Sequence, residues 1–132
     1  TKAVAAETEV AKALEFRYFS LPTKTFFKPS DAHVDRVLQI LDDPSNYPVF
    51  IHCTHGRDRT GLMMGLYRVE ADGWDPKDAY QEMVDLGFRR VLFALKGYYK
   101  NRTGMKFMSE EQLVRTAGIE SPLVSGSSAE AF

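Results

Sequence analysis

The stretch HCTHGRDRTG, residues 52–61, decides how the rest of the chain is interpreted. The short apolar run at residues 48–52 has the length and composition of a buried strand. The stretch at residues 60–71 is apolar nearly all round, which is typical of a buried helix. Residues 52–61 are therefore expected to form a loop between a strand and the N-terminus of a helix.

A loop of this kind can bind an anion and activate a thiol. Backbone N–H groups of a tight turn, together with the N-terminus of the following helix, attract a phosphate group. The same surroundings lower the pKa of a thiol, so we expect Cys53 to act as a thiolate nucleophile. Arg59 offers a planar fork of donors that can hold two phosphate oxygens. Gly56 allows the positive φ or close approach that such a turn requires.

The neighbouring side chains have expected roles as well. The Thr60 hydroxyl can hydrogen-bond the cysteine sulfur as it leaves the phosphoenzyme. The His52 ring N–H can orient the loop rather than act as a base. The residues expected to surround the phosphate are Thr54, His55, Gly56, Arg57, Asp58 and Arg59.

Residues 52–61 resemble the signature of the protein tyrosine phosphatase superfamily, His-Cys-x5-Arg-(Ser/Thr), and the resemblance extends into the preceding strand and to Gly61. It implies a hydrolase of phosphate monoesters that forms a phosphocysteine and needs no metal or other cofactor. The remainder of the chain looks like the compact dual-specificity and phytase-like members of that superfamily.

Asp58 bears on the substrate. The order C-x4-D-R-T looks like the loops of myotubularin and Sac phosphoinositide phosphatases, which favours a small polyanionic substrate such as an inositol polyphosphate. Alternatively, Asp58 pairs with a neighbour such as Arg57 or caps the helix. Lys24 and Lys28 are candidate substrate contacts, although lysines in loops often serve only solubility.

Two other functions stay open at this point. One is a dual-specificity protein phosphatase, which would act on a phosphoprotein. The other is a catalytically inactive domain that binds phosphorylated ligands; the presence of Cys53 and Arg59 argues against it.

The sequence offers two candidates for the general acid of the site. The resemblance places this acid in the loop at residues 23–29, which contains no aspartate. Asp31 and Asp58 are the remaining candidates, and Asp31 is also explained as a favourable charge in a first helical turn. Trp74-Asp75-Pro76 is interpreted as a helix start, not as an acid loop.

The pattern of the chain predicts an α/β fold like that of protein tyrosine phosphatases, with a central, parallel-containing sheet flanked by helices. Two strands make a poor sheet, so further N-terminal strands are expected to be missing from this chain. Strands are predicted at residues 16–21 and 48–52. Helices are predicted at residues 7–14, from Ser30 to Leu41, at 60–71, from Asp75, at 91–100 and at 109–117.

Composition sets the remaining limits. Residues 1–120 are expected to form a single phosphatase domain and residues 121–132 a tail. With 17 basic and 18 acidic residues the net charge is −1, so no general attraction to nucleic acid or to a membrane is expected. Cys53 is the single cysteine, which excludes an intramolecular disulfide and a cysteine-based zinc site. A soluble protein is expected, either cytoplasmic or exported after removal of a signal.

Overall fold

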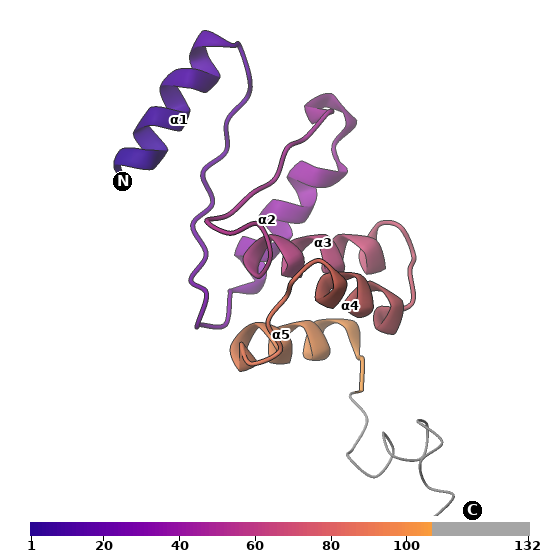
Figure 1. Ribbon diagram of the computed structural model, residues 1–132. Helices are drawn as coiled ribbons and strands as arrows, with labels where there is room; N and C mark the ends of the chain where they lie inside the picture. Colours follow the sequence, from indigo (N-terminus) through magenta and orange to yellow (C-terminus); the bar gives the residue numbers. More distant parts are fainter. Residues whose placement is uncertain (107–132) are drawn as a thin grey trace, which may run out of the picture.

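The computed structural model describes residues 1–106 of the chain, and in these residues all regular structure is helical (Figure 1). The predicted helix 109–117 and the predicted tail lie outside the described residues. The elements are α1 (Lys2–Ala13), α2 (Asp31–Asp42), the short 3-10 helix η1 (Pro44–Asn46), α3 (Arg59–Glu70), α4 (Pro76–Asp85) and α5 (Phe93–Thr103).

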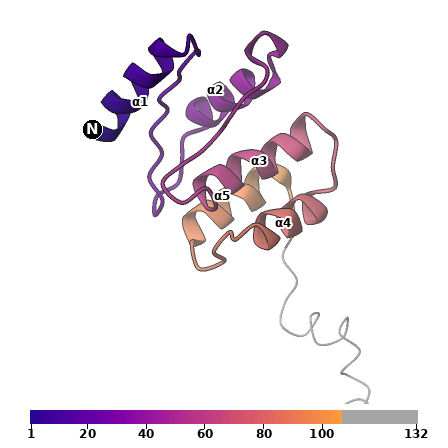
Figure 2. The same cartoon turned by 45° about the horizontal axis from the view of Figure 1, so that its top comes forward.

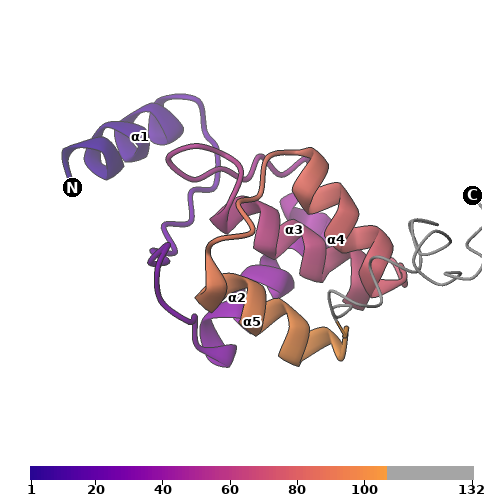
Figure 3. The ribbon, with the colours of Figure 1, turned by 60° about the horizontal axis from the view of Figure 1, so that its bottom comes forward.

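Helix α3 lies at the centre of the packed part of the molecule. It contacts α2, α4 and α5, and Figure 3 shows it between these three helices. The buried side chains of the four helices and of the α4–α5 connection form one core. Its members are Val34, Val37, Leu41, Leu62, Met63, Leu66, Tyr80, Met83, Phe88, Leu92, Leu95, Tyr98 and Tyr99.

Gly65 permits the close approach of α3 to its neighbours. A Cβ atom at this position would lie 2.3 Å from Met83 Sδ and 3.3 Å from Tyr99 Cε2. Met83 and Tyr99 are themselves buried, so neither can move aside freely. The glycine therefore sets the spacing between α3, α4 and α5.

Several helix ends follow the capping chemistry of the sequence. Ser30 Oγ accepts the His33 N–H at 3.2 Å at the start of α2. Asp75 accepts the Lys77 N–H at 2.8 Å at the start of α4, where Pro76 is the first helical residue. This confirms that Trp74-Asp75-Pro76 is a helix start. At the other end of α5, Gly104 has φ +74°, a left-handed conformation that ends the helix.

Two predicted helices have shifted bounds. Helix α1 begins at Lys2, earlier than predicted, because Thr1 Oγ1 caps it by accepting the Val4 N–H at 3.2 Å. Helix α5 begins at Phe93 and continues to Thr103, where the glycine that follows ends it.

The two predicted strands are not strands within residues 1–106. Residues 16–20 and 49–53 carry no regular secondary structure, and the described residues contain no strand ladder. A strand exists only where its backbone N–H and C=O groups meet a partner strand. The burial expected for residues 48–52 is found only in part: Ile51 is partly buried against the core, whereas Phe50 is 86% exposed. The predicted sheet is therefore not seen here.

Helix α1 lies apart from the cluster of α2 to α5, at the end of a long extended connection (Figures 1 and 2). Tyr18 in this connection donates a hydrogen bond to Glu7 of α1 at 2.6 Å. No helix among residues 1–106 is long and apolar enough to cross a membrane.

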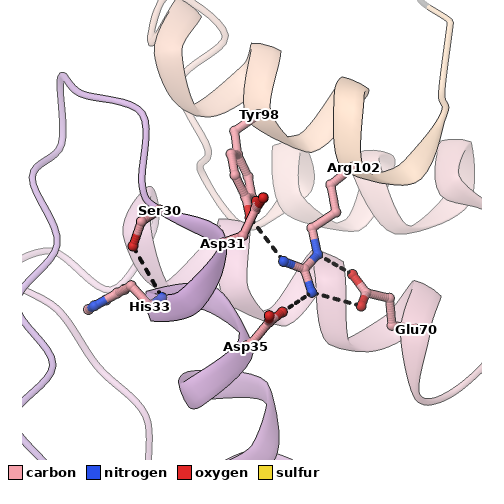
Figure 4. Close-up of polar contacts among 7 residues, drawn as sticks. All are labelled: Ser30, Asp31, His33, Asp35, Glu70, Tyr98 and Arg102. Carbon is pink, nitrogen blue, oxygen red and sulfur yellow. Dashed lines mark hydrogen bonds and ion pairs between the residues drawn. The ribbon is translucent and has the colours of Figure 1, made fainter.

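Arg102 ties three helices together. Its guanidinium donates to both carboxylate oxygens of Glu70 on α3, at 2.7 and 3.0 Å, and to Asp35 on α2 (Figure 4). It also donates to the Tyr98 hydroxyl at 3.0 Å, and Tyr98 in turn donates to Asp31 at 2.7 Å. The network holds the first turns of α2 against α5.

Candidate active site

The residues between the run 48–52 and helix α3 form a loop, residues 53–58, which together with Arg59 is here called the phosphate loop. Gly56 has φ +66°, so the left-handed conformation of the turn falls on the residue that tolerates it best. The helix begins directly afterwards, because the Leu62 N–H donates to the Asp58 carbonyl at 2.9 Å. Arg59 is the first residue of α3.

Cys53 lies at the beginning of this loop and is partly buried. Burial of the thiol opposes its ionisation, but hydrogen bonds from Thr60 and from the backbone N–H groups of His55 and Gly56 outweigh it and lower the pKa of Cys53 to about 7. A large fraction of Cys53 is therefore thiolate at neutral pH, as a nucleophile requires.

The Thr60 hydroxyl is placed to serve this sulfur. Its oxygen is buried and has no partner of conventional hydrogen-bond geometry within residues 1–106, so it is available to Cys53. Both its hydroxyl and its backbone N–H lower the pKa of Cys53.

Arg59 is held in place by two acceptors from different parts of the chain. Its Nη2 donates to Thr54 Oγ1 at 3.1 Å, within the phosphate loop. Its Nη1 donates to the Thr23 carbonyl at 3.1 Å. Two of the five donors of the guanidinium are thus used to orient it, and three stay available for a phosphate group.

Asp58 is buried, and its carboxylate is bound by Arg89. The backbone N–H of Arg89 donates to Oδ1 at 2.9 Å, and the Arg89 side chain donates to Oδ2. Burial opposes ionisation of this carboxyl, but the hydrogen bonds and charge of Arg89, helped by the charge of Arg57, lower the pKa of Asp58 below its ordinary value. The side chain makes no cap hydrogen bond to α3. Of the structural roles considered for Asp58, pairing with a basic side chain fits this geometry, and capping of α3 does not.

The other predicted site residues differ in their surroundings. Thr54, His55 and Gly56 are exposed on the loop itself. His52 points toward α1, with Nε2 3.6 Å from Glu7 Oε1. The Lys24 Nζ lies 5.3 Å from the centre of the Phe27 ring.

Asp31 and Lys28 belong to a neighbouring hollow rather than to the phosphate loop. This hollow is lined by Lys28, Asp31, Asp35, Tyr98, Asn101 and Arg102. Asp31 is exposed at the first position of α2, where it accepts the hydrogen bond from Tyr98 (Figure 4).

Sequence reasoning missed two of the contacts that build the site. Arg89 is the main partner of Asp58, although it lies 31 residues further along the chain. Thr23 contributes a backbone carbonyl to Arg59, and a carbonyl leaves no signal in the sequence.

The comparison with protein families agrees with this geometry. The family described as "DSP-PTPase phosphatase fused to NAD+ Kinase" matches residues 1–101, which is most of the chain. The chain belongs to this family. The resemblance of residues 52–61 to the protein tyrosine phosphatase superfamily is thereby confirmed, and membership implies the protein tyrosine phosphatase-like fold.

Individual relatives of this DSP-PTPase chain include phosphatases of two kinds. The dual specificity protein phosphatase TpbA of Pseudomonas aeruginosa strain PAO1 is 42% identical over 73 residues, which are 54% of this chain and 33% of TpbA. Inositol diphosphatase DSP3 of Arabidopsis thaliana is 34% identical over 65 residues, 47% of this chain and 31% of DSP3. Inositol diphosphatase DSP4 of the same plant is 42% identical over 43 residues, 33% of this chain and 22% of DSP4.

The matched part of the chain spans about a third or less of the length of these curated relatives. No solved structure matches the chain significantly.

Proposed function

We propose that this protein hydrolyses phosphate monoesters through a phosphocysteine on Cys53, and that its substrates are inositol polyphosphates. The observation that carries the first part is the pKa of Cys53, lowered to about 7 within a loop of backbone N–H donors that leads into a helix. Membership of the DSP-PTPase family supports the same reaction.

In this mechanism, Cys53 Sγ attacks the phosphorus atom in line with the leaving oxygen. The S–P bond forms as the P–O bond to the leaving group breaks, and the leaving oxygen takes up a proton. Arg59 and the loop N–H groups stabilise the three equatorial oxygens in the transition state. Water then attacks the phosphocysteine, which releases phosphate and regenerates the thiolate, and the Thr60 hydroxyl supports the departing sulfur.

Of the two candidate acids, Asp31 suits the proton transfer better. Asp58 is paired with Arg89 and its lowered pKa keeps it ionised, whereas an acid must carry a proton. Asp31 is exposed and follows the segment that contacts Arg59 through Thr23, but in the hollow beside α5 it accepts a hydrogen bond from Tyr98. In this proposal Asp58 holds the loop, and Asp31 must exchange the Tyr98 hydroxyl for the leaving oxygen before it protonates that oxygen.

The choice of inositol polyphosphates rests on positive side chains and on relatives. Arg57 and Arg89 flank Asp58, while Lys24 and Lys28 lie on the segment held by Arg59. Asp58 neutralises one of these charges, and the positive charge that remains favours a polyanionic substrate. Two relatives carry the name inositol diphosphatase.

A second candidate function is dual-specificity protein phosphatase. It is favoured by the 42% identity to TpbA. The alignment with TpbA covers 54% of this chain, a larger share than the alignments with the two inositol diphosphatases. In that case the partner would be a phosphoprotein.

One assay separates these possibilities. Phosphate release is measured from inositol hexakisphosphate, from a phosphotyrosine peptide and from an aryl phosphate, with Cys53→Ser as the control. The proposal expects release from inositol hexakisphosphate, and loss of all activity in Cys53→Ser. Release from the peptide alone would overturn the substrate, and activity that survives Cys53→Ser would overturn the mechanism.

We extend the proposal to the sheet that the family's fold implies. Residues 16–21 and 49–52 carry no regular secondary structure, and Phe16 and Phe50 are 68% and 86% exposed. Such side chains are normally buried once a strand is covered. The two segments are proposed to take part in strand pairing in the intact protein. Slow hydrogen exchange at residues 49–51 of the intact protein is expected, and fast exchange there would contradict the pairing.

A further inference from the structure

The segment 23–28 carries an exposed pair of aromatic rings between two lysines. The Phe26 and Phe27 side chains are 72% and 63% exposed. Lys24 and Lys28 flank them, and the Lys24 ammonium lies against the Phe27 ring. Two large apolar side chains that lie next to each other at a loop tip, mostly exposed and flanked by lysines, form a small patch suited to an interface.

The charge of this region is positive although the chain as a whole is nearly neutral. Residues 16–30 contain Arg17, Lys24 and Lys28 and no aspartate or glutamate. The nearest acidic residues that follow, Asp31 and Asp35, are directed to Tyr98 and Arg102 (Figure 4). The surface complementary to this loop is therefore negatively charged as well as partly apolar.

Hydrogen bonds and burial hold both ends of the segment 23–28 in place, whereas Phe26 and Phe27 at its tip are exposed. At one end, the Thr23 carbonyl accepts the hydrogen bond from Arg59, and the Thr23 hydroxyl pairs with His33. At the other end, Pro29 is buried and Ser30 caps α2. The aromatic tip is thus held close to the phosphate loop without being part of it.

We propose that residues 23–28 are an interfacial membrane anchor. Phe26 and Phe27 enter the boundary between headgroups and acyl chains of an anionic phospholipid bilayer, while Lys24 and Lys28 bind lipid phosphates. Exposed aromatic side chains flanked by lysines are the combination that such an interface takes up. The net charge of −1 does not oppose this binding, because the attraction acts within a Debye length of the loop.

Membrane binding by this loop does not depend on the proposed hydrolysis. If the proposed function is also correct, docking would bring the Arg59 side of the phosphate loop to the level of phosphorylated headgroups. The binding experiment therefore uses no substrate, and its failure and the failure of the phosphatase assay are separate results.

The test is co-sedimentation of the full chain with vesicles of phosphatidylcholine alone and of phosphatidylcholine mixed with phosphatidylserine. We expect binding to the mixed vesicles only. The double variant Phe26→Ala/Phe27→Ala should weaken it by about tenfold or more. Each of Lys24→Ala and Lys28→Ala should weaken it by about fivefold, with a smaller dependence on salt. Cys53→Ser should bind like the native chain.

Phe93→Ala and Lys77→Ala are matched controls, because Phe93 is 75% exposed and Lys77 is an exposed lysine on α4. Both should bind like the native chain, and circular dichroism checks that each variant is folded. Absence of binding to the mixed vesicles would overturn the proposal. Equal loss in Phe93→Ala and in the double variant would do the same. A double variant that binds normally but changes the oligomeric state would assign the loop to a second copy of the chain instead.

Discussion

Arg89 binds the carboxylate of Asp58 through three of its nitrogen atoms. Its backbone N–H lies 2.9 Å from Oδ1, its Nε 3.0 Å from Oδ2 and its Nη2 2.8 Å from Oδ2. Asp58 is the residue before α3 and is 3% exposed, whereas Arg89 lies in the connection between α4 and α5. The pair therefore fixes the phosphate loop to a segment 31 residues away.

Removing either partner should loosen the loop. Asp58→Asn is expected to lower the free energy of unfolding by about 1.5–3 kcal/mol, because charged hydrogen bonds are lost. Arg89→Ala should cost less, since its backbone N–H stays in place and its side chain is 40% exposed. Urea unfolding of both single variants and the double variant measures the coupling between them, and strictly additive losses would contradict the pairing. Arg90→Ala, at the adjacent exposed position, is the control.

The same pair predicts how stability depends on pH. The pKa of Asp58 is lower in the folded protein than in the unfolded chain, so its contribution is fully present above the ordinary pKa of aspartate, about 3.9. It is lost as the pH falls through the lowered folded value. The native chain and Asp58→Asn should therefore differ most in stability near neutral pH and converge in acid. A difference that stayed constant down to strongly acidic pH would show that Asp58 is not held as a carboxylate.

The ionisation of Cys53 can be followed by alkylation. The rate with iodoacetamide should rise with pH through a midpoint of about 7. Thr60→Val removes a hydroxyl that lowers this pKa, so the midpoint should move upward. Thr54→Val, whose hydroxyl bonds Arg59 and not the sulfur, should leave it close to the native midpoint. A midpoint near that of a free thiol, about 8.5, would contradict the activated state.

Two glycines in helices give opposite predictions for stability. Gly65→Ala places a methyl group against Met83 and Tyr99, and overpacking of this kind should cost about 1–3 kcal/mol. Gly97→Ala, on α5, has open space around the new Cβ and should stabilise the protein by about 0.5–1 kcal/mol. Thermal unfolding of the two variants compares them directly. Equal effects of the two substitutions would contradict the close contact between Gly65 of α3 and Met83 of α4.

Features fixed by neighbouring residues were predictable from the sequence. The helix that begins at Asp31 follows from the Ser30 cap and the spacing of Val34, Val37 and Leu41. The family follows from residues 52–61, where the expected nucleophile Cys53, the turn glycine Gly56 and the expected phosphate-binding Arg59 lie within ten residues of sequence. Both are local patterns, so no knowledge of distant contacts is needed.

Features that depend on distant partners were not predictable. The partner of Asp58 lies 31 residues away, and the partner of Arg59 is a backbone carbonyl 36 residues away. The predicted strands fail within residues 1–106 for a similar reason: an alternating or apolar run indicates a face that can be buried, but only a second strand can satisfy its backbone. Phe50, expected to be buried, is therefore exposed in the described part of the chain.

The central claim is that Cys53 forms a covalent bond to phosphorus. It is tested most directly by quenching the protein with acid during turnover of inositol hexakisphosphate and of an aryl phosphate, and by measuring the mass of the Cys53 peptide. We predict a fraction of this peptide heavier by one phosphoryl group in the native chain, and none in Cys53→Ser. Phosphate release without any such adduct, or with the phosphoryl group on another residue, would contradict the account.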